Sequence, residues 1–170
     1  MANDPHQVGF FVGAALEASA RKFPEKTALI AKEEELSFSA VNDRVTCLAS
    51  HLQRKGIRQG DRVGLLLPNS IAFALSYFGT QRMGAVTVVM DARLKGKELV
   101  GVLQNADLSL LITHKRLLSE TGEALKEFSR LSLWIVEGEG ETSFEKRLSA
   151  APAAFLPPRL KPEDDALILY

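Results

Sequence analysis

Apolar and polar positions alternate in a repeating order from residue 61 onward. Apolar runs over residues 62–67, 85–90, 108–113 and 131–136 predict four β-strands that begin about every 23 residues. The middle runs are almost entirely apolar, which is typical of strands that are covered on both faces. Each gap holds one stretch with helical spacing of its apolar residues. This order predicts an α/β fold in which helices cover a parallel βαβ sheet with right-handed crossovers.

The pattern before residue 61 is different. Residues 8–22 predict a first helix, which Pro24 closes, and the segments TALIA and EEELSF predict two short strands. Ser39 is the predicted N-cap of the next helix, and Gly56 is its predicted left-handed C-cap. The apolar stripe of that helix consists of Val41, Val45, Leu48 and Leu52.

The last thirty residues depart from the repeating order of strands and helices. Thr142 and Glu145 have the spacing of a capping box, which predicts a short helix through Leu148. The final segment, DDALILY, predicts a buried strand. We therefore expect the chain to be organised in four segments. These are residues 8–60 with helices and short strands, 61–150 with parallel βα repeats, 151–163 as a proline-rich connector, and 164–170 as a last strand.

Composition narrows the class of protein. Apolar residues make up 46 % and charged residues 25 %, as in ordinary soluble domains. The 21 basic and 21 acidic residues balance, so no nucleic-acid footprint is expected. The single cysteine, Cys47, excludes an internal disulfide and a multi-cysteine metal site. It fits a cytoplasmic protein, and we expect it to pack as a small hydrophobic residue.

Two stretches could be mistaken for targeting or membrane segments. The apolar run near the start lacks the basic residues of a signal peptide, which favours a buried amphipathic helix. Residues 63–81 carry no charge and approach the length of a membrane span. The Pro68-Asn69-Ser70 turn interrupts them, which predicts a buried strand followed by a buried helix and no transmembrane segment.

Ligands of such sheets bind beyond the carboxyl ends of the strands, so the residues there are the candidates for chemistry. Asn69 opens a helix, and capping explains it. Asp91 could be a metal ligand, an acid or a phosphate acceptor, but a turn cap is the simpler interpretation. His114 has no visible partner in the sequence, which favours a structural or solvated side chain.

One segment imitates a dinucleotide-binding loop. Gly138, Gly140 and Ser143 follow the last of the four strands with a G-x-G-x-x-S spacing. The surrounding Glu137, Glu139 and Glu141 would repel a pyrophosphate. We interpret the segment as an acidic surface turn. From the residues alone, no catalytic, cofactor-binding or metal-binding residue is assigned.

Several segments, in this order, resemble one known family. "GIRQGDRVGLLLPNS" is similar to the segment G-hydrophobic-x-x-GDRV-x-hydrophobic-PNS of the adenylate-forming enzymes, which include acyl-CoA synthetases and AMP-dependent ligases. "QRMGAVTVVMDARL" resembles a second segment of that family, and the likeness covers nearly the whole chain. The chain departs from the family pattern at Ala40, Val89 and Asp91, where Glu, Pro and Asn are common.

The resemblance implies a function for a longer protein. Such an enzyme activates a small-molecule carboxylate with ATP and Mg²⁺ and then forms a thioester, most often with coenzyme A. In the family, a strand such as DDALILY leads into a phosphate-binding loop, and the catalytic groups follow it. We therefore expect a fragment that is inactive alone and binds none of these ligands. The alternatives are a stand-alone α/β binding module that dimerises through an exposed surface, and a small enzyme that uses Asp91 and His114.

Overall fold

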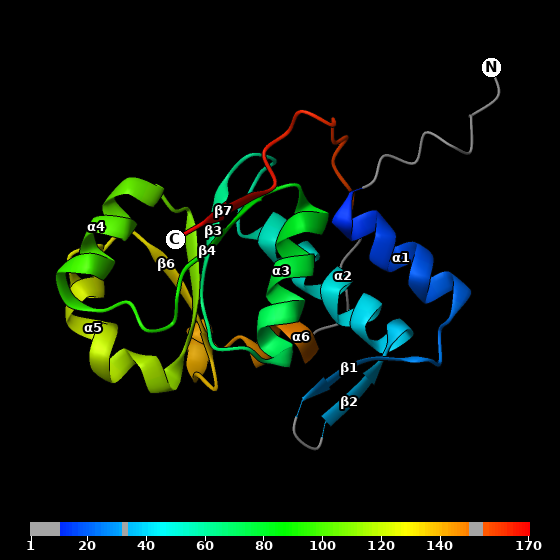
Figure 1. Cartoon of the computed structure of the whole chain (residues 1–170), viewed down its shortest axis with the longest axis horizontal. Helices are drawn as coiled ribbons and strands as arrows, with labels where there is room; N and C mark the ends of the chain where they lie inside the picture. The colour runs from blue at the N-terminus through cyan, green and yellow to red at the C-terminus, as the bar shows by residue number, and fades with distance from the viewer. Residues whose placement is uncertain (1–10, 32–33, 150–154) are drawn as a thin grey trace.

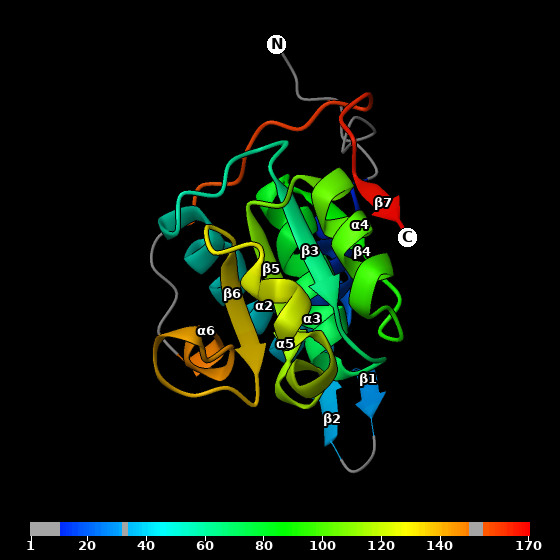
Figure 2. The same ribbon diagram turned by 90° about the vertical axis from the view of Figure 1, so that its left-hand side faces the viewer.

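The centre of the molecule is a five-stranded parallel sheet. The structure is a computed structural model, and it describes residues 11–31, 34–149 and 155–170. The strand order is β6-β5-β3-β4-β7, and every neighbouring pair is parallel (Figure 2). The strands are β3 (Arg62–Leu66), β4 (Val86–Val89), β5 (Leu110–His114), β6 (Ser132–Val136) and β7 (Leu167–Leu169). The α/β fold and the four predicted repeat strands are therefore confirmed.

Helices cover both faces of this sheet (Figure 1). One face carries α1 (Val12–Lys22), α2 (Phe38–Arg54) and α3 (Ile71–Met83), and the other carries α4 (Gly96–Ala106) and α5 (Leu118–Lys126). The alternation of side chains along each strand divides the core in two. Leu65 packs in the cluster with α2 and α3, whereas the next residue, Leu66, packs in the cluster with α4. The uncharged stretch 63–81 is thus a buried strand and a helix, as predicted.

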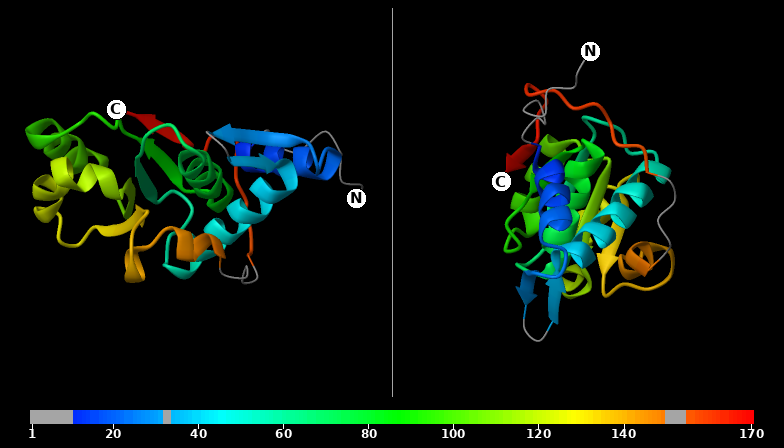
Figure 3. Two further views of the ribbon diagram at one scale, coloured as in Figure 1. Left: turned by 90° about the horizontal axis from the view of Figure 1, so that it is seen from below. Right: turned by 90° about the vertical axis from the view of Figure 1, so that its right-hand side faces the viewer.

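The smaller elements lie around this core. An antiparallel hairpin of β1 (Thr27–Ala31) and β2 (Glu34–Ser37) precedes α2. The right panel of Figure 3 shows helix α2 beside helix α1. Short 3₁₀ helices η1 (Lys115–Leu117) and η2 (Gly140–Thr142) follow β5 and β6, and α6 (Glu145–Ser149) follows η2. Between residue 155 and β7 the chain forms no helix or strand, and residues 151–154 of the predicted connector lie outside the described residues.

Three predicted helix caps are wrong by one or two residues. Ser37, not Ser39, caps α2, because the helix starts directly at the end of β2 and the Ala40 N–H donates to Ser37 Oγ at 3.2 Å. Ser70, not Asn69, caps α3, because Ser70 Oγ accepts the Phe73 N–H at 3.1 Å. Ser and Asn are comparable caps, so the register of the turn decides which one is used.

The third error concerns the predicted capping box at Thr142. The Thr142 hydroxyl donates to the Glu139 carbonyl and closes the η2 turn instead. The cap falls to Ser143, whose Oγ accepts the Lys146 N–H at 3.4 Å. The Glu145 carboxylate does not bond the backbone of Thr142. It accepts the Glu137 N–H at 2.8 Å. Helix α6 is correspondingly short.

Helices α1, α2 and α3 are joined by a buried arginine. Arg82 on α3 donates to Asn42 Oδ1 at 2.8 Å and to Thr46 Oγ1 at 2.5 Å, both on α2. It also donates to the Gly13 carbonyl of α1 at 3.4 Å. Burial lowers the pKa of Arg82, and the charges of Glu17 and Asp43 oppose that shift. These hydrogen bonds satisfy a cation that would otherwise be costly to bury.

The last strand is more exposed than the sequence predicts. β7 pairs with β4 on one side and stands at the edge of the sheet. Ile168 packs toward α4, but Leu169 is 69 % exposed and Tyr170 is 40 % exposed. The prediction of a buried strand is therefore wrong for this segment. An edge strand has only one neighbouring strand, and on the other face of β7 the side chains of Leu167 and Leu169 stay 41 % and 69 % exposed.

Candidate functional site at the carboxyl edge of the sheet

A cavity of about 290 Å³ lies beyond the carboxyl ends of β3, β5 and β6. The turn after β3 contributes Asn69, the end of β5 contributes His114 and Arg116, and the end of β6 contributes Glu137. Residues of the β1–β2 hairpin close it from the side. This is the place where ligands bind in open parallel sheets, because loops from adjacent strands diverge there to opposite faces.

His114 is a largely buried polar group of this cavity. Its Nδ1 accepts the Arg116 N–H at 3.2 Å, and its side chain is 12 % exposed. Because Nδ1 is an acceptor, the neutral ring carries its proton on Nε2. Nε2 lies 3.7 Å from Glu137 Oε2, which is an ion-pair distance but too long for a hydrogen bond.

Glu137 is the partner that sequence reasoning missed for His114. The two residues are far apart in the sequence, but His114 pairs with Val136 in the register of β5 and β6. Glu137 therefore follows directly beside the imidazole, in a left-handed backbone conformation with φ of 58°. The strand order could have revealed this pair, since adjacent parallel strands bring their last residues together.

Asp91 lies outside this cavity. It follows β4, and its N–H donates to the Tyr170 carbonyl at 3.3 Å. Its Oδ1 accepts the Arg93 N–H at 2.9 Å, so the interpretation as a turn cap is confirmed. Hydrogen bonds from the Arg93 guanidinium and N–H lower the pKa of Asp91 from 3.8 to about 2. A carboxylate held ionised in this way is a poor general acid. The alternative of a small enzyme that uses Asp91 and His114 is not supported, because His114 lines the cavity and Asp91 does not.

The segment that imitates a dinucleotide loop is a closed turn. The Gly138 N–H donates to the Ile135 carbonyl at 3.0 Å, and Gly140 adopts φ of 62° at the start of η2. Glu139 is exposed and pairs with Lys115 at 3.2 Å. These contacts confirm the interpretation as an acidic surface turn.

Cys47 behaves as predicted. It is 6 % exposed on the buried side of α2. Burial, and secondarily the charge of Asp43, raise the pKa of its thiol. A raised pKa lowers the fraction of reactive thiolate, so Cys47 is unsuited to nucleophilic chemistry.

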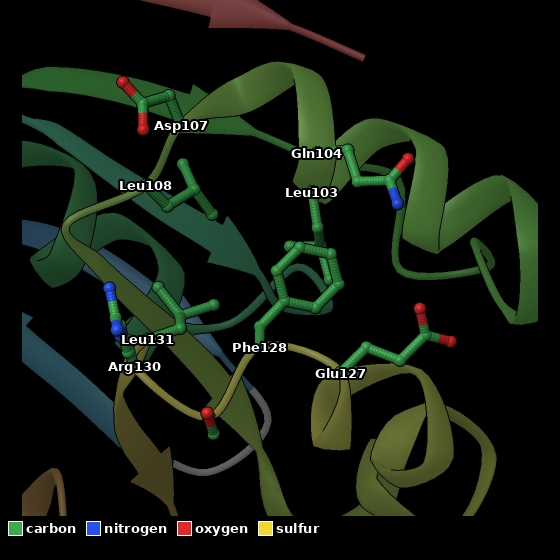
Figure 4. A pocket seen from close by; sticks show the side chains of 9 residues that line it. Leu103, Gln104, Asp107, Leu108, Glu127, Phe128, Arg130 and Leu131 are labelled. Atoms are coloured by element: carbon green, nitrogen blue, oxygen red, sulfur yellow. The ribbon is translucent and has the colours of Figure 1, made fainter.

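A larger cavity, of about 550 Å³, lies at the opposite end of the sheet (Figure 4). It is formed where α4 leads into β5 and α5 leads into β6. Figure 4 shows the Phe128 ring and the Leu103 side chain directed toward one another, with Asp107 and Glu127 at the rim. Its two carboxylates have no ion-pair partner in the described part of the chain. We favour the smaller cavity because it combines donors with the usual ligand edge.

The described residues contain neither a candidate metal cluster nor a candidate membrane span. Within residues 11–31, 34–149 and 155–170, no three His, Cys, Asp or Glu side chains gather where they could hold a metal ion. The helices of the same ranges include none with the length and hydrophobicity needed to cross a membrane.

Comparison with known proteins decides the family. The model of the AMP-binding enzyme family matches residues 16–170, which is most of the chain. The chain belongs to the AMP-binding enzyme family. Because the match includes the sheet and both helix layers, the predicted family is confirmed together with the fold.

The relatives of this AMP-binding domain include several CoA ligases. It is 29 % identical over 161 residues to a crotonobetaine/carnitine–CoA ligase of Salmonella paratyphi B, covering 87 % of this chain and 31 % of that protein. A long-chain-fatty-acid–CoA ligase of Archaeoglobus fulgidus superposes with a TM-score of 0.86 at 29 % identity, over 95 % of this chain and 34 % of that one. A benzoate–CoA ligase of Burkholderia xenovorans shares the fold, with a TM-score of 0.82, 22 % identity, and coverage of 93 % and 32 %. The chain spans about a third of the length of these proteins.

Proposed function

We propose that this chain is the amino-terminal part of an ATP-dependent ligase that activates a carboxylate and transfers it to coenzyme A. The observation that carries the proposal is the family match over residues 16–170 together with relatives that are acyl-CoA ligases. The chain covers 31 % of the Salmonella ligase, so most of such an enzyme would lie outside it.

The proposed chemistry has two steps. The substrate carboxylate attacks the α-phosphorus of ATP, which forms an acyl-adenylate and releases pyrophosphate. The thiol then attacks the acyl carbon and displaces AMP, a far better leaving group than a carboxylate oxygen. Mg²⁺ would neutralise charge on the phosphates. The described residues lack a cluster that could hold that ion, so we assign none of them to ATP, Mg²⁺ or coenzyme A.

The part of this chain in the proposed enzyme is structural. The Tyr170 N–H donates to the Val89 carbonyl at 3.0 Å, and the Tyr170 carbonyl accepts the Asp91 N–H. Tyr170 also donates its hydroxyl hydrogen to Asn105 Oδ1. By family resemblance, a phosphate-binding loop follows a strand such as β7. These contacts would start that loop at the carboxyl edge of the sheet, beside Asp91.

Isotope exchange tests the proposal. The native protein that contains this sequence is captured from its source with an antibody against the chain, and its size is read by blotting. We expect a band well above 18.6 kDa and carboxylate-dependent exchange of pyrophosphate into ATP. The purified 170-residue chain serves as the control and should give no exchange. Exchange by the chain alone would overturn the assignment of the catalytic groups to the remainder of the protein.

One observation favours the alternative of a stand-alone binding module. Leu167 and Leu169 are 41 % and 69 % exposed on the edge strand, next to the half-exposed Tyr170. An apolar edge strand invites pairing with another strand. In this alternative a second copy covers β7, and sedimentation equilibrium should show a monomer–dimer equilibrium that Leu169→Lys shifts to monomer. A monomer at all concentrations, together with a native band above 18.6 kDa, excludes the alternative.

A further inference from the structure

We propose that Gln81 is the positioning residue that docks β7 onto the sheet, and that β7 leaves the sheet together with the segment before it. Residues 155–166, which we call the strap, form this segment. Figure 1 shows the strap running past the start of α1 into β7. The docking of β7 stands on the described contacts, whereas its part in catalysis rests on the proposed ligase function.

The side chains of β7 hold the strand only weakly. The strand has three residues and pairs with β4 alone. Leu167 and Leu169 are exposed, and Ile168 is only partly buried against the core. Burial of apolar surface is the main force that holds an element in place. Contacts outside β7 must therefore contribute to its docking.

The strap before β7 has few backbone donors of its own. Pro157, Pro158 and Pro162 have no N–H group, and the strap forms no helix or strand. Its carbonyl groups therefore need donors from other parts of the chain. Glutamine side chains of α2, of the turn after α2 and of α3 supply three such donors, namely Gln53, Gln59 and Gln81.

Two of these glutamines bind the strap itself. Gln53 Nε2 donates to the Leu156 carbonyl at 3.0 Å, and Gln53 Oε1 accepts the Leu156 N–H at 3.5 Å. Gln59 Nε2 donates to the Arg159 carbonyl at 3.3 Å and to Asp164 Oδ2 at 2.7 Å. These hydrogen bonds are exposed, so water competes for the same groups and each bond contributes little.

Gln81 binds at the point where the strap becomes β7. Its Nε2 donates to the Ala166 carbonyl at 2.6 Å and to Thr87 Oγ1 of β4 at 2.9 Å. The Ala166 carbonyl also accepts the Thr87 N–H at 2.9 Å, at the start of the pairing of β4 with β7. Gln81 is 7 % exposed, so water replaces these bonds poorly. Gln81 thus joins α3, β4 and the start of β7.

The strap is seated on the same end of α3. Gly84 is the C-cap of this helix, with φ of 71°. A Cβ atom added at Gly84 would lie 2.6 Å from Leu160 Cδ2 and 2.9 Å from Pro158 Cγ. The strap therefore lies directly on the backbone that ends α3, three residues after Gln81. Because strap and strand are fastened at one place, we expect them to open together.

The proposed function gives this unit a role. By family resemblance, a phosphate-binding loop follows a strand such as β7. Docking of β7, through the bond from the Tyr170 N–H to the Val89 carbonyl, would then fix where that loop starts. Gln81 would act on the loop through β7 and not by contact with the nucleotide. A bound nucleotide should in turn favour the docked state, since a ligand stabilises the state to which it binds.

Native-state hydrogen exchange of the 170-residue chain tests the docking. The Thr87 and Tyr170 amides bond across the pair of β4 and β7, whereas the Met90 N–H donates to the Leu65 carbonyl of β3. Gln81→Met keeps the approximate volume of the side chain and removes both of its hydrogen bonds. We expect about tenfold faster exchange at Thr87 and Tyr170 and no change at Met90. Equal acceleration at all three amides, or none at all, would overturn the proposal.

A second variant tests whether the strap and β7 open as one unit. Gln59 contacts the strap and not β7, and it is exposed, so its removal leaves the core intact. If the two segments open together, Gln59→Ala should still speed exchange at Thr87, by about threefold. Gln104→Ala, at an exposed position of α4, is the matched control and should change nothing. An unchanged rate at Thr87 in Gln59→Ala would refute opening as one unit.

The native protein that contains this sequence separates the docking role from the ligase function. Exchange in the peptide that spans β7 is read there by mass spectrometry, and saturating ATP should slow it at least about tenfold. Selective acceleration in the 170-residue chain, without an effect of ATP on the native protein, would support the docking role of Gln81 and contradict the role of β7 in nucleotide binding. Loss of the selectivity would overturn the docking role whatever the ligase activity.

Discussion

The contact between α2 and α3 predicts how one substitution changes the free energy of unfolding. Gly79 lies in α3, against Leu48 of α2. A Cβ atom added at Gly79 would lie 2.7 Å from Leu48 Cδ2, 3.0 Å from Cγ and 3.1 Å from Cβ. Leu48 is fully buried, so it has no room to retreat toward solvent. Gly79→Ala should therefore overpack this interface, at a cost of about 1–3 kcal/mol.

Helix propensity acts in the opposite direction and must be separated from the overpacking. Alanine gains about 1 kcal/mol over glycine inside a helix. Gly101 in α4 supplies the matched control, because it is exposed and a Cβ there would meet nothing within 4 Å. Gly101→Ala should stabilise the protein by about 1 kcal/mol. The two variants should thus differ in their free energies of unfolding by about 1–3 kcal/mol, which is the overpacking term alone.

Urea denaturation followed by tryptophan fluorescence measures this difference. Trp134 is the single tryptophan and is 3 % exposed, so it reports loss of the core. If Gly79→Ala stabilises the protein as much as Gly101→Ala does, the close approach of α2 and α3 is refuted. A double-mutant cycle refines the test, since Leu48→Ala should relieve the Gly79→Ala strain and give a favourable coupling of about 1–3 kcal/mol.

Three further predictions concern ionisable groups. The pKa of Asp91 is lowered, so the stabilising contribution of its carboxylate is present above pH 3.8 and is lost as the pH falls toward 2. Carboxyl NMR should place the titration midpoint of Asp91 near 2, and Arg93→Gln should return that midpoint toward 3.8. Arg82→Lys should destabilise the protein by about 2 kcal/mol in urea, because one ammonium cannot replace a guanidinium that donates to two helices. Burial raises the pKa of the Cys47 thiol, so Ellman's reagent at pH 8 should modify the native protein at least about tenfold more slowly than the urea-unfolded protein. A midpoint near 3.8 in the parent protein, an unchanged urea midpoint or equal thiol rates would contradict the respective prediction.

Local pattern was sufficient for the secondary structure and the fold class. The apolar runs at 62–67 and 108–113 are long enough to be strands and too short to be helices, so each could be assigned without knowing its neighbours. The alternating order of strands and helices then leaves a parallel sheet as the main solution. The helix caps were less certain, because Ser37 and Ser39 offer the same hydroxyl and the turn geometry selects between them.

The amino-acid sequence by itself determined the α/β class and the family, because each of these depends on neighbours along the chain or on motifs within it. Tertiary structure alone decided that β7 is a half-exposed edge strand and that Asp91 and His114 lie apart. It also brought His114 to Glu137, through the pairing of β5 with β6. The order of strands in a sheet depends on which crossovers bury the most apolar surface. The total buried apolar area is a property of the whole chain and not of any one segment.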